Sequence, residues 1–497
     1  MSVALWLAVA HAATLTVAPG GDLWGTIAKA APGDEVVVSA GTWSSQQGSG
    51  SWYRRVELLG TEVAPIVVRA ADGARPILEG DPAGSQNLVN LAGRYFTWRG
   101  FEMRGGSHGL RLESSAHVVL EDLEIHDVAD VGLSMNIPGS TYEAITVRRV
   151  EIHDTAGDAG ECMYLGCNDD GCQVFDSVIE FNWCHDTLAA GQGDGIELKT
   201  GSYDNTIRHN VIHDVHYPGI TVYGTRGRGT NEVYGNVVWN SGDNGIQTVG
   251  DAFVHDNLVF ASAGNGIASK PSQGEVPNHL RIVHNTVVGA GDACLRGNEW
   301  AATTDVVVAN NALFCAGANA IKLPQGRGDV VFLANAVAGA DDAGVGSFAA
   351  DLARDLTDAA ALDAWPAPGS ALIAAADVGW ATIDDFDGRR RTGAPDVGAY
   401  EAGGARGWAV GPGFKVLVED ADADTDSDSD TDTDTAADTD APPDTDVAAG
   451  ACGCAGAPRG AGLAGVLAMA LFARRRRGPA AFSPIRPTEG ARAPTRA

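Results

Sequence analysis

One short segment of the chain carries three side chains that could do chemistry together. The carboxylates of Asp194 and Glu197 and the amine of Lys199 lie within six residues. Carboxylates can hold Ca²⁺, and a lysine can act as a base once its ammonium form is destabilised. Removing the proton alpha to a sugar carboxylate needs both a cation and a base. The segment therefore suits β-elimination of a uronate.

The charge state of Lys199 decides whether it could be such a base. Asp194 and Glu197 alone would raise its pKa, because nearby negative charge favours the ammonium form. A bound divalent cation, or a dry site closed by substrate, would lower the pKa instead. Without a cation, the three groups are expected to form an exposed ion pair.

These residues belong to a repeat of 20-odd residues. The pattern glycine-hydrophobic-x-hydrophobic begins at Gly195, Gly219, Gly245 and Gly266, at intervals of 24, 26 and 21 residues. Short alternating strands at this period indicate a parallel β-solenoid, in which each repeat forms one coil. Residues one repeat apart are then neighbours on a common wall.

Asparagines and histidines recur with the same period. We expect the asparagines to form a buried ladder, each amide donating and accepting hydrogen bonds along the stack; they are Asn210, Asn236, Asn257, Asn285 and Asn311. Histidines of a repeated Ile-His-Asp pattern predict a second column, His126, His153, His185 and His213. A metal bound along the histidines is the alternative, but a structural ladder is favoured.

The alternation predicts which side chains face outward. If the hydrophobic residues after each glycine point inward, the residues between and after them form two outer columns. The first column is Arg111, Ser134, Glu197, Thr221, Gln247, Ala268, Arg296 and Lys322; the second is Glu113, Asn136, Lys199, Tyr223, Val249, Lys270 and Asn298. An insertion from Thr155 to Phe175, which breaks the rhythm, adds acidic residues including Glu161 beside this wall.

Six cysteines in the repeat region are candidates for disulfides. Cys162, Cys167, Cys172 and Cys184 form a cluster with three possible connectivities, and Cys294 and Cys315 lie about one coil apart. Disulfides are typical of oxidising compartments, and a zinc site is the alternative for the cluster of four.

The two ends of the chain indicate export. Residues 1–12 resemble a signal peptide with a small-x-small cleavage pattern. Residues 13–402 are expected to form the β-helix with its N-terminal cap, and 403–418 a connector. Much of the net charge of −30 lies in the Asp/Thr/Ser-rich segment 419–450, which is expected to be a disordered stalk. The chain has no basic face of the kind that nucleic acid requires.

Residues 451–478 combine Cys452, Cys454, an apolar run and four arginines. This segment resembles the C-terminal sorting signals of myxobacterial surface proteins, which implies attachment to the outer envelope. A simple membrane anchor is the alternative, and it predicts the same outside location. Residues 479–497 are expected to be a disordered tail.

Several segments of the chain occur together in a known family: Ala31-Pro32-Gly33-Asp34, Arg99-Gly100-Phe101-Glu102, the asparagine-headed coils and the closing segments 385–389 and 396–401. With these segments, the chain from about residue 14 to 402 resembles the secreted right-handed parallel β-helix proteins of the pectin lyase-like superfamily. The resemblance implies an all-β, right-handed parallel β-helix and a carbohydrate ligand. The reaction is not implied, since lyases, hydrolases, epimerases and adhesins share the fold.

The segment around Lys199 is also similar to that of β-helical alginate and chondroitin lyases. Asp194, Lys199 and Asn205 match that pattern approximately, but Tyr223-Gly224 stands where the family has an arginine, with Arg226 and Arg228 in the following loop. We therefore assign candidate roles as follows: catalysis to Lys199, Tyr223 and Arg226; substrate binding to Tyr217, Arg228, Gln247 and Lys270; and metal binding, with calcium as the candidate cofactor, to Asp194, Glu197 and Glu161.

Taken together, the sequence predicts a monomeric, exported, envelope-attached β-helix that engages an acidic polysaccharide. A polysaccharide lyase is favoured. A noncatalytic glycan-binding or structural surface protein is the first alternative. A glycoside hydrolase, which needs two carboxylates across a sugar and could draw them from Asp194 and Glu197, is the second.

Overall fold

A computed structural model describes residues 12–44, 52–81, 84–404 and 406–417; the side chains of Trp52 and Tyr53 are not described. The expected signal peptide up to residue 11, the stalk, the sorting segment and the tail lie outside these residues. Among the described residues, no helix is long and apolar enough to span a membrane.

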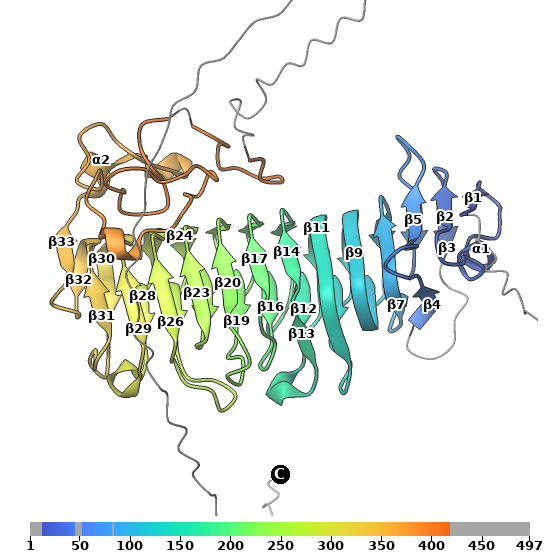
Figure 1. Cartoon of the computed structure of the whole chain (residues 1–497), viewed down its shortest axis with the longest axis horizontal. Coiled ribbons are helices and arrows are strands. Elements are labelled where there is room, and N and C mark those ends of the chain that lie inside the picture. Colours follow the sequence, from blue (N-terminus) through green and yellow to red (C-terminus); the bar gives the residue numbers. More distant parts are fainter. Residues whose placement is uncertain (1–11, 45–51, 82–83, 405, 418–497) are drawn as a thin grey trace, which may run out of the picture. The chain divides into compact units, whose positions relative to one another are not determined.

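The described chain is a parallel β-helix, as the repeat predicted (Figure 1). Within it, 33 strands, β1 to β33, are joined into one network by parallel pairing of each coil with the next. Five strands turn corners and contribute to more than one wall: β7 (Asn87–Arg99), β9 (Leu110–Val128), β11 (Thr141–Thr155), β30 (Ala312–Lys322) and β32 (Asn335–Asp341).

Three parallel sheets form the walls, and we number them in the order in which a coil passes through them. The shorter strands of the first sheet are β4 (Trp52–Leu59), β10 (Leu133–Met135), β12 (Met163–Leu165), β16 (Ile196–Leu198), β19 (Ile220–Val222), β22 (Ile246–Thr248), β25 (Asn265–Ser269) and β28 (Ala293–Gly297).

The second sheet contains β1 (Thr14–Val17), β2 (Glu35–Val38), β5 (Ile66–Ala70), β14 (Val178–Glu180), β17 (Thr206–Arg208), β20 (Asn231–Tyr234), β23 (Ala252–His255), β26 (Leu280–Val283), β29 (Val306–Ala309) and β31 (Val331–Leu333). The third contains β3 (Thr42–Ser44), β6 (Ile77–Glu79), β8 (Glu102–Arg104), β15 (Trp183–His185), β18 (Val211–His213), β21 (Val237–Trp239), β24 (Leu258–Ser262), β27 (Thr286–Ala290) and β33 (Ser347–Ala349). Strand β13 (Gln173–Phe175) pairs with the start of β11.

The N-terminal cap contains one short helix, α1, which spans Leu23–Ile27. Asp22 caps it, because its carboxylate accepts a hydrogen bond from the amide of Gly25 at 2.9 Å. Leu23 and Ile27 are buried in the main core, so the helix covers the open end of the first coils.

The asparagine ladder is confirmed and is longer than predicted. Each side-chain amide donates to the Oδ1 of the asparagine one coil on, at 2.9–3.0 Å. Asn182 and Asn335 extend the predicted series at its two ends. A second, shorter ladder joins Asn205 to Asn231. Since these side chains are buried, the ladders satisfy polar backbone groups at the turns that water cannot reach.

The histidine column is confirmed as a structural stack. The rings of His126, His153, His185 and His213 lie 4.9–5.2 Å apart and are nearly parallel. Each Nδ1 hydrogen-bonds the aspartate that follows it, at 2.7–2.8 Å. These contacts occupy one ring nitrogen of every histidine in the stack.

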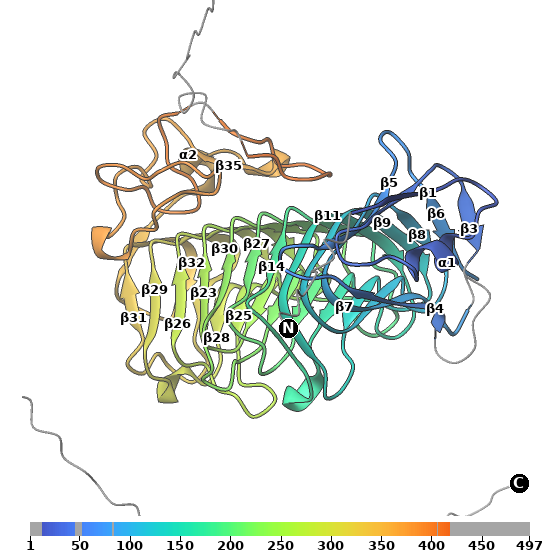
Figure 2. The same cartoon turned by 45° about the vertical axis from the view of Figure 1, so that its right-hand side comes forward.

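After β33 the chain leaves the coils and folds back over the third sheet (Figure 2). Residues 350–417, which we call the C-terminal layer, contain α2 (Leu352–Asp355), the antiparallel pair β34 (Leu356–Asp358) and β35 (Asp363–Pro366), and two turns of 3₁₀ helix. Phe386 and Tyr400 of this layer pack with Trp239 and Phe260 of the third sheet in one apolar cluster.

A buried ion pair also ties the layer to the coils. Arg391 of the layer contacts Asp256, which follows β23, at 2.7 Å, and both side chains are almost fully buried. The residues predicted as a connector pack as well: Lys415 is buried and donates to the carbonyl of Gly235 at 2.8 Å. The outer face of the first sheet is not part of these contacts.

The ladder gives a direct test of what holds the coils together. Asn236→Ala removes hydrogen bonds to Ile207, Asn210 and Asn257, and it leaves buried partners unsatisfied. We expect a loss of about 3 kcal/mol in the free energy of unfolding, measured by denaturant titration. Asn298→Ala, a half-exposed asparagine on the outer wall, is the matched control and should change it by less than about 0.5 kcal/mol. Equal losses for both variants would contradict the structural role of the ladder.

Candidate active site on the first sheet

The predicted outer column forms on the first sheet, with one additional member. Strand pairing places Arg111, Ser134, Tyr164, Glu197, Thr221 and Gln247 side by side on successive coils. Tyr164 was missed because the segment 155–175 was interpreted wholly as an insertion. It contains strand β12, which follows Cys162 where the other coils have glycine. The repeat was therefore present, with cysteine in place of its first glycine.

Three carboxylates meet where two coils adjoin. Glu161 precedes β12, Asp194 precedes β16, and the backbones of the two residues are on paired positions because the amide of Cys162 donates to the carbonyl of Asp194. Glu197 projects from the middle of β16. One oxygen from each of the three lies within 4.8 Å of the others. All three side chains are at least 97% buried.

Glu161 is the least satisfied of the three. Neither of its oxygens accepts a hydrogen bond from another residue that the structure describes. One oxygen of Glu197 likewise has no partner among the described residues. Asp194, by contrast, accepts a hydrogen bond from the Thr221 hydroxyl at 2.7 Å. Buried carboxylates without partners need a proton or a cation to compensate them.

The pKa values follow from this crowding. Burial, and then the charge of Glu197, raise the pKa of Glu161 to about 7. The same two causes raise the pKa of Asp194 well above its usual range. At neutral pH and without a cation, the cluster therefore retains protons that ordinary carboxyls have lost.

The cluster fits a calcium ion in its donor set and its size. Calcium prefers carboxylate oxygens at about 2.3–2.6 Å, so two ligands on opposite sides of the ion lie about 5 Å apart. The 4.8 Å limit among Glu161, Asp194 and Glu197 matches that span. No other group of three or more metal-ligating side chains of this kind occurs among the described residues.

Lys199 forms the expected ion pair, but the pair is buried rather than exposed. Its Nζ lies 2.5 Å from Glu197 Oε1, and the ammonium faces the rings of Tyr164 at 4.4 Å and Tyr223 at 5.2 Å. Burial alone would lower the pKa of Lys199, but Glu197 and Tyr164 outweigh it and raise the pKa. The pKa of Lys199 is thus shifted upward, as predicted for the cation-free state.

Two local features shape the space around Lys199. The Tyr223 hydroxyl donates to Glu197 Oε1 at 3.3 Å, and burial raises its pKa far above the usual value, so the phenol stays protonated. On the neighbouring coil, Gly166 has a φ of +92°, and a Cβ there would lie 3.1 Å from that of Lys199. A side chain at residue 166 would therefore crowd Lys199 as well as strain the backbone.

The structure separates the other predicted site residues. Tyr217 precedes strand β19, whereas Tyr223 follows it, and Tyr217 is 41% exposed. Partial burial, and then the charges of Asp243, Asp194 and Glu197, raise its pKa. Gln247 is two coils from Glu197 and accepts a hydrogen bond from Asn244. Lys270 follows β25, one coil beyond.

The two arginines are engaged in loops at the edge of the sheet. Arg228 forms a two-pronged ion pair with Asp170, with both contacts at 2.6 Å. Arg226 contacts Glu275 at 2.6 Å and donates to the carbonyl of Gln273. Neither has a recorded contact with the carboxylate cluster. The structure gives both arginines a role in holding these loops together.

Asn205 is placed elsewhere as well. It belongs to the second asparagine ladder and is buried in the interior, where it donates to the carbonyl of Val174. The match of Asn205 to a lyase pattern is therefore a coincidence of spacing, since its side chain faces away from the outer wall.

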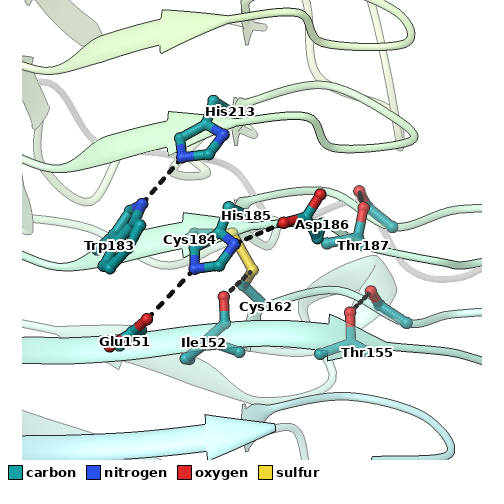
Figure 3. Close-up of a disulfide and its surroundings, with 12 residues drawn as sticks. Glu151, Ile152, Thr155, Cys162, Trp183, Cys184, His185, Asp186, Thr187 and His213 are labelled. Atoms are coloured by element: carbon teal, nitrogen blue, oxygen red, sulfur yellow. Dashed lines mark hydrogen bonds and ion pairs between the residues drawn. A yellow bond between two sulfur atoms is a disulfide. The ribbon is translucent and has the colours of Figure 1, made fainter. Parts of the chain in front are cut away.

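The six cysteines form three disulfides: Cys162–Cys184, Cys167–Cys172 and Cys294–Cys315. The zinc alternative for the cluster of four is therefore wrong. Cys162 directly follows Glu161, and Cys184 directly precedes His185 of the histidine stack (Figure 3). The first bridge thus joins the backbone of a candidate metal ligand to the third sheet. The disulfides fit an exported protein.

Comparison with known proteins supports the fold. A family model described as "Right handed beta helix region" matches residues 88–259. No curated protein sequence matches the chain. The solved structure of pectate lyase Pel9A is similar with a TM-score of 0.51 and 15% identity, covering 78% of this chain and 96% of that one. The complex of XylC with xylose gives 0.52 and 12%, covering 78% and 98%. The chain is thus a right-handed parallel β-helix.

Removal of the first disulfide should loosen the site. Replacing Cys162 and Cys184 together by alanine opens a loop with a sequence separation of 22 residues, and we expect a loss of roughly 3 kcal/mol in the free energy of unfolding. Cation binding should weaken as well, because Glu161 is then held less firmly. The Cys294 and Cys315 double replacement is the matched control: a similar loss of stability with unchanged cation affinity is expected. Equal weakening of cation binding by both would contradict a local role for the first bridge.

The carboxylate cluster also predicts a pH dependence. The folded-state pKa of Glu161 lies above its ordinary 4.5, so the folded protein holds this proton more tightly than the unfolded chain does. In chelator, the free energy of unfolding should therefore fall as pH rises from 4.5 to about 7, by at most about 3 kcal/mol from this group. Added Ca²⁺ should restore the loss, because it stabilises the ionised form.

Unfolding midpoints across this pH range, with calcium and with chelator, measure the effect. Glu161→Gln should abolish most of the fall and of the calcium response. Glu143→Gln, which changes an exposed glutamate on β11, should behave as wild type. A calcium response that survives Glu161→Gln in full would place the cation elsewhere.

Proposed function

We propose that the protein is an exported polysaccharide lyase-like enzyme that acts on uronate-containing polymers at the outer face of the first sheet. The observation that carries this proposal is the juxtaposition of a buried carboxylate cluster, in which Glu161 has no partner among the described residues, with a buried lysine and a protonated tyrosine. The fold is compatible with this activity but does not specify it.

A divalent cation, with calcium as the candidate, would be held by Glu161, Asp194 and Glu197, and it supplies positive charge that neutralises a sugar carboxylate. The chain's own residues carry the proton transfers. Lys199 Nζ takes the proton alpha to the carboxylate, which burial favours once Glu197 no longer compensates the ammonium. Tyr223 keeps its proton at neutral pH and can give it to the departing glycosidic oxygen.

The bond changes balance without a further reactant. The electrons of the broken C–H bond form a double bond in the sugar ring, the bond from the ring to the glycosidic oxygen breaks, and that oxygen gains a proton. We assign the exposed ring of Tyr217 to contact with the polymer; Gln247 and Lys270 follow further along the same wall. Arg226 and Arg228 support the loops at the edge.

The activity test is direct. The purified protein is incubated with alginate, pectate or chondroitin, in calcium or in chelator, and the absorbance of unsaturated uronate is followed. We expect calcium-dependent absorbance on one of these polymers. Lys199→Ala should lower the rate by about 10²- to 10⁴-fold, as loss of a general base does, with polymer binding retained. Lys29→Ala, an exposed lysine of the cap, is the control.

The buried ion pair also supports a second candidate, a noncatalytic glycan-binding role. A lysine whose pKa stays raised by Glu197 remains an ammonium group, which can donate hydrogen bonds to a bound polymer but cannot accept a proton. The same assay separates the two: binding without absorbance on any polymer identifies the noncatalytic role. Reducing ends released without unsaturated uronate identify a hydrolase. Either outcome contradicts the lyase proposal.

A further inference from the structure

The C-terminal layer contains a cavity that lies apart from the acidic cluster. It has a volume of about 240 Å³ and lies between the segment 361–365, the turn at Asp387, Tyr400 and the segment 406–410. These elements belong to the layer that packs on the third sheet, whereas the acidic cluster projects from the first. The cavity is therefore a separate feature of the molecule.

Aromatic rings form much of its wall. Trp365 and Trp408 both line the cavity and are only half-buried, while Tyr400 is buried behind them with its ring 5.1 Å from that of Trp365. Phe386 packs edge-on against Tyr400 and fixes it from below. The guanidinium groups of Arg389 and Arg406 lie over the ring of Trp365, at 5.4 and 5.8 Å from its centroid, whereas no described cation lies over Trp408. Rings of this size usually bury most of their surface, so the half-buried Trp408 facing a small cavity suggests a ligand that covers it.

Polar groups are placed at the same cavity. Arg406 and Asp363 form an ion pair that lines it. Asp387 is 96% buried; one of its oxygens accepts a hydrogen bond from the amide of Gly407 at 3.0 Å, and the other has no partner among the described residues. An unpartnered buried acceptor is costly, and a ligand hydroxyl would satisfy it.

We propose that this cavity binds one neutral sugar unit of a saccharide, by stacking on Trp408, by contact with Trp365 and by hydrogen bonds between sugar hydroxyls and Asp387, Asp363 and Arg406. A sugar ring combines an apolar face with hydroxyls around its edge, which matches aromatic walls bordered by charged groups. Ligand sites for drug-sized molecules measure about 300–1,000 Å³, so the smaller cavity suits a single ring.

The charges select for a neutral sugar. Two carboxylates, Asp363 and Asp387, line the cavity. Two guanidinium groups balance them: Arg406, which is paired with Asp363, and Arg389, which lies over the ring of Trp365. The cavity thus has no surplus positive charge to attract a uronate. It would hold a neutral saccharide independently of the acidic polymer proposed for the first sheet.

The test is a binding titration of the full-length protein in chelator, followed by tryptophan fluorescence and by calorimetry. Xylo- and cello-oligosaccharides serve as neutral probes, and oligogalacturonates as acidic ones. We expect saturable binding of a neutral probe and at least tenfold weaker binding of the acidic probe. Trp408→Ala and the isosteric Asp387→Asn should each weaken neutral binding at least tenfold, and thermal unfolding verifies that both variants are folded.

Two control variants make the result specific. Trp380→Ala removes a tryptophan of the same layer that packs near Arg281 and does not line the cavity, and it should bind as wild type. Glu161→Gln should also bind the neutral probe as wild type, so failure of the lyase proposal leaves this one intact. No binding of any neutral probe, unchanged binding by Trp408→Ala, or loss of binding in Glu161→Gln would overturn it.

Discussion

The structure depends on one constraint: each coil must pair in register with the coil before it. Parallel strands lie about 4.8 Å apart, so every side chain is repeated at that distance along the wall. Any group that is costly to bury must then find its partner in the copy one coil away. The amides of Asn210, Asn236 and Asn257 meet this condition by hydrogen bonding, and the histidine rings by stacking.

The carboxylate cluster is the place where that stacking becomes unfavourable by itself. Glu161 and Asp194 occupy equivalent positions on adjoining coils, and Glu197 is added from the strand beside them. Like charges at this spacing cannot all remain ionised, which is why protons are retained there in the absence of a cation. Register therefore supports both the stability of the fold and the unusual chemistry of its outer wall.

The periodic features of the chain were predictable, and the features set by loops were not. The glycine-headed strands predicted the first outward column correctly, because alternation along a strand is a local rule. Tyr164 was not predicted, because Cys162 replaces the glycine that begins the pattern in the other coils. The burial of Lys199 and the pairing of Arg228 depend on loops that meet from distant coils, such as Asn168 and Gln273, 105 residues apart. No local sequence pattern predicts such contacts.

The disulfides have a consequence for how such a molecule can change in length. Cys162–Cys184 and Cys294–Cys315 each close a single coil on itself, and the third bridge lies within the first of these coils. None of them fastens one repeat to its neighbour. A whole repeat could therefore be duplicated or deleted between the two bridged coils without creating an unpaired thiol. Cross-linking of this kind leaves the solenoid modular, and relatives with more or fewer rungs could keep the same covalent bonds.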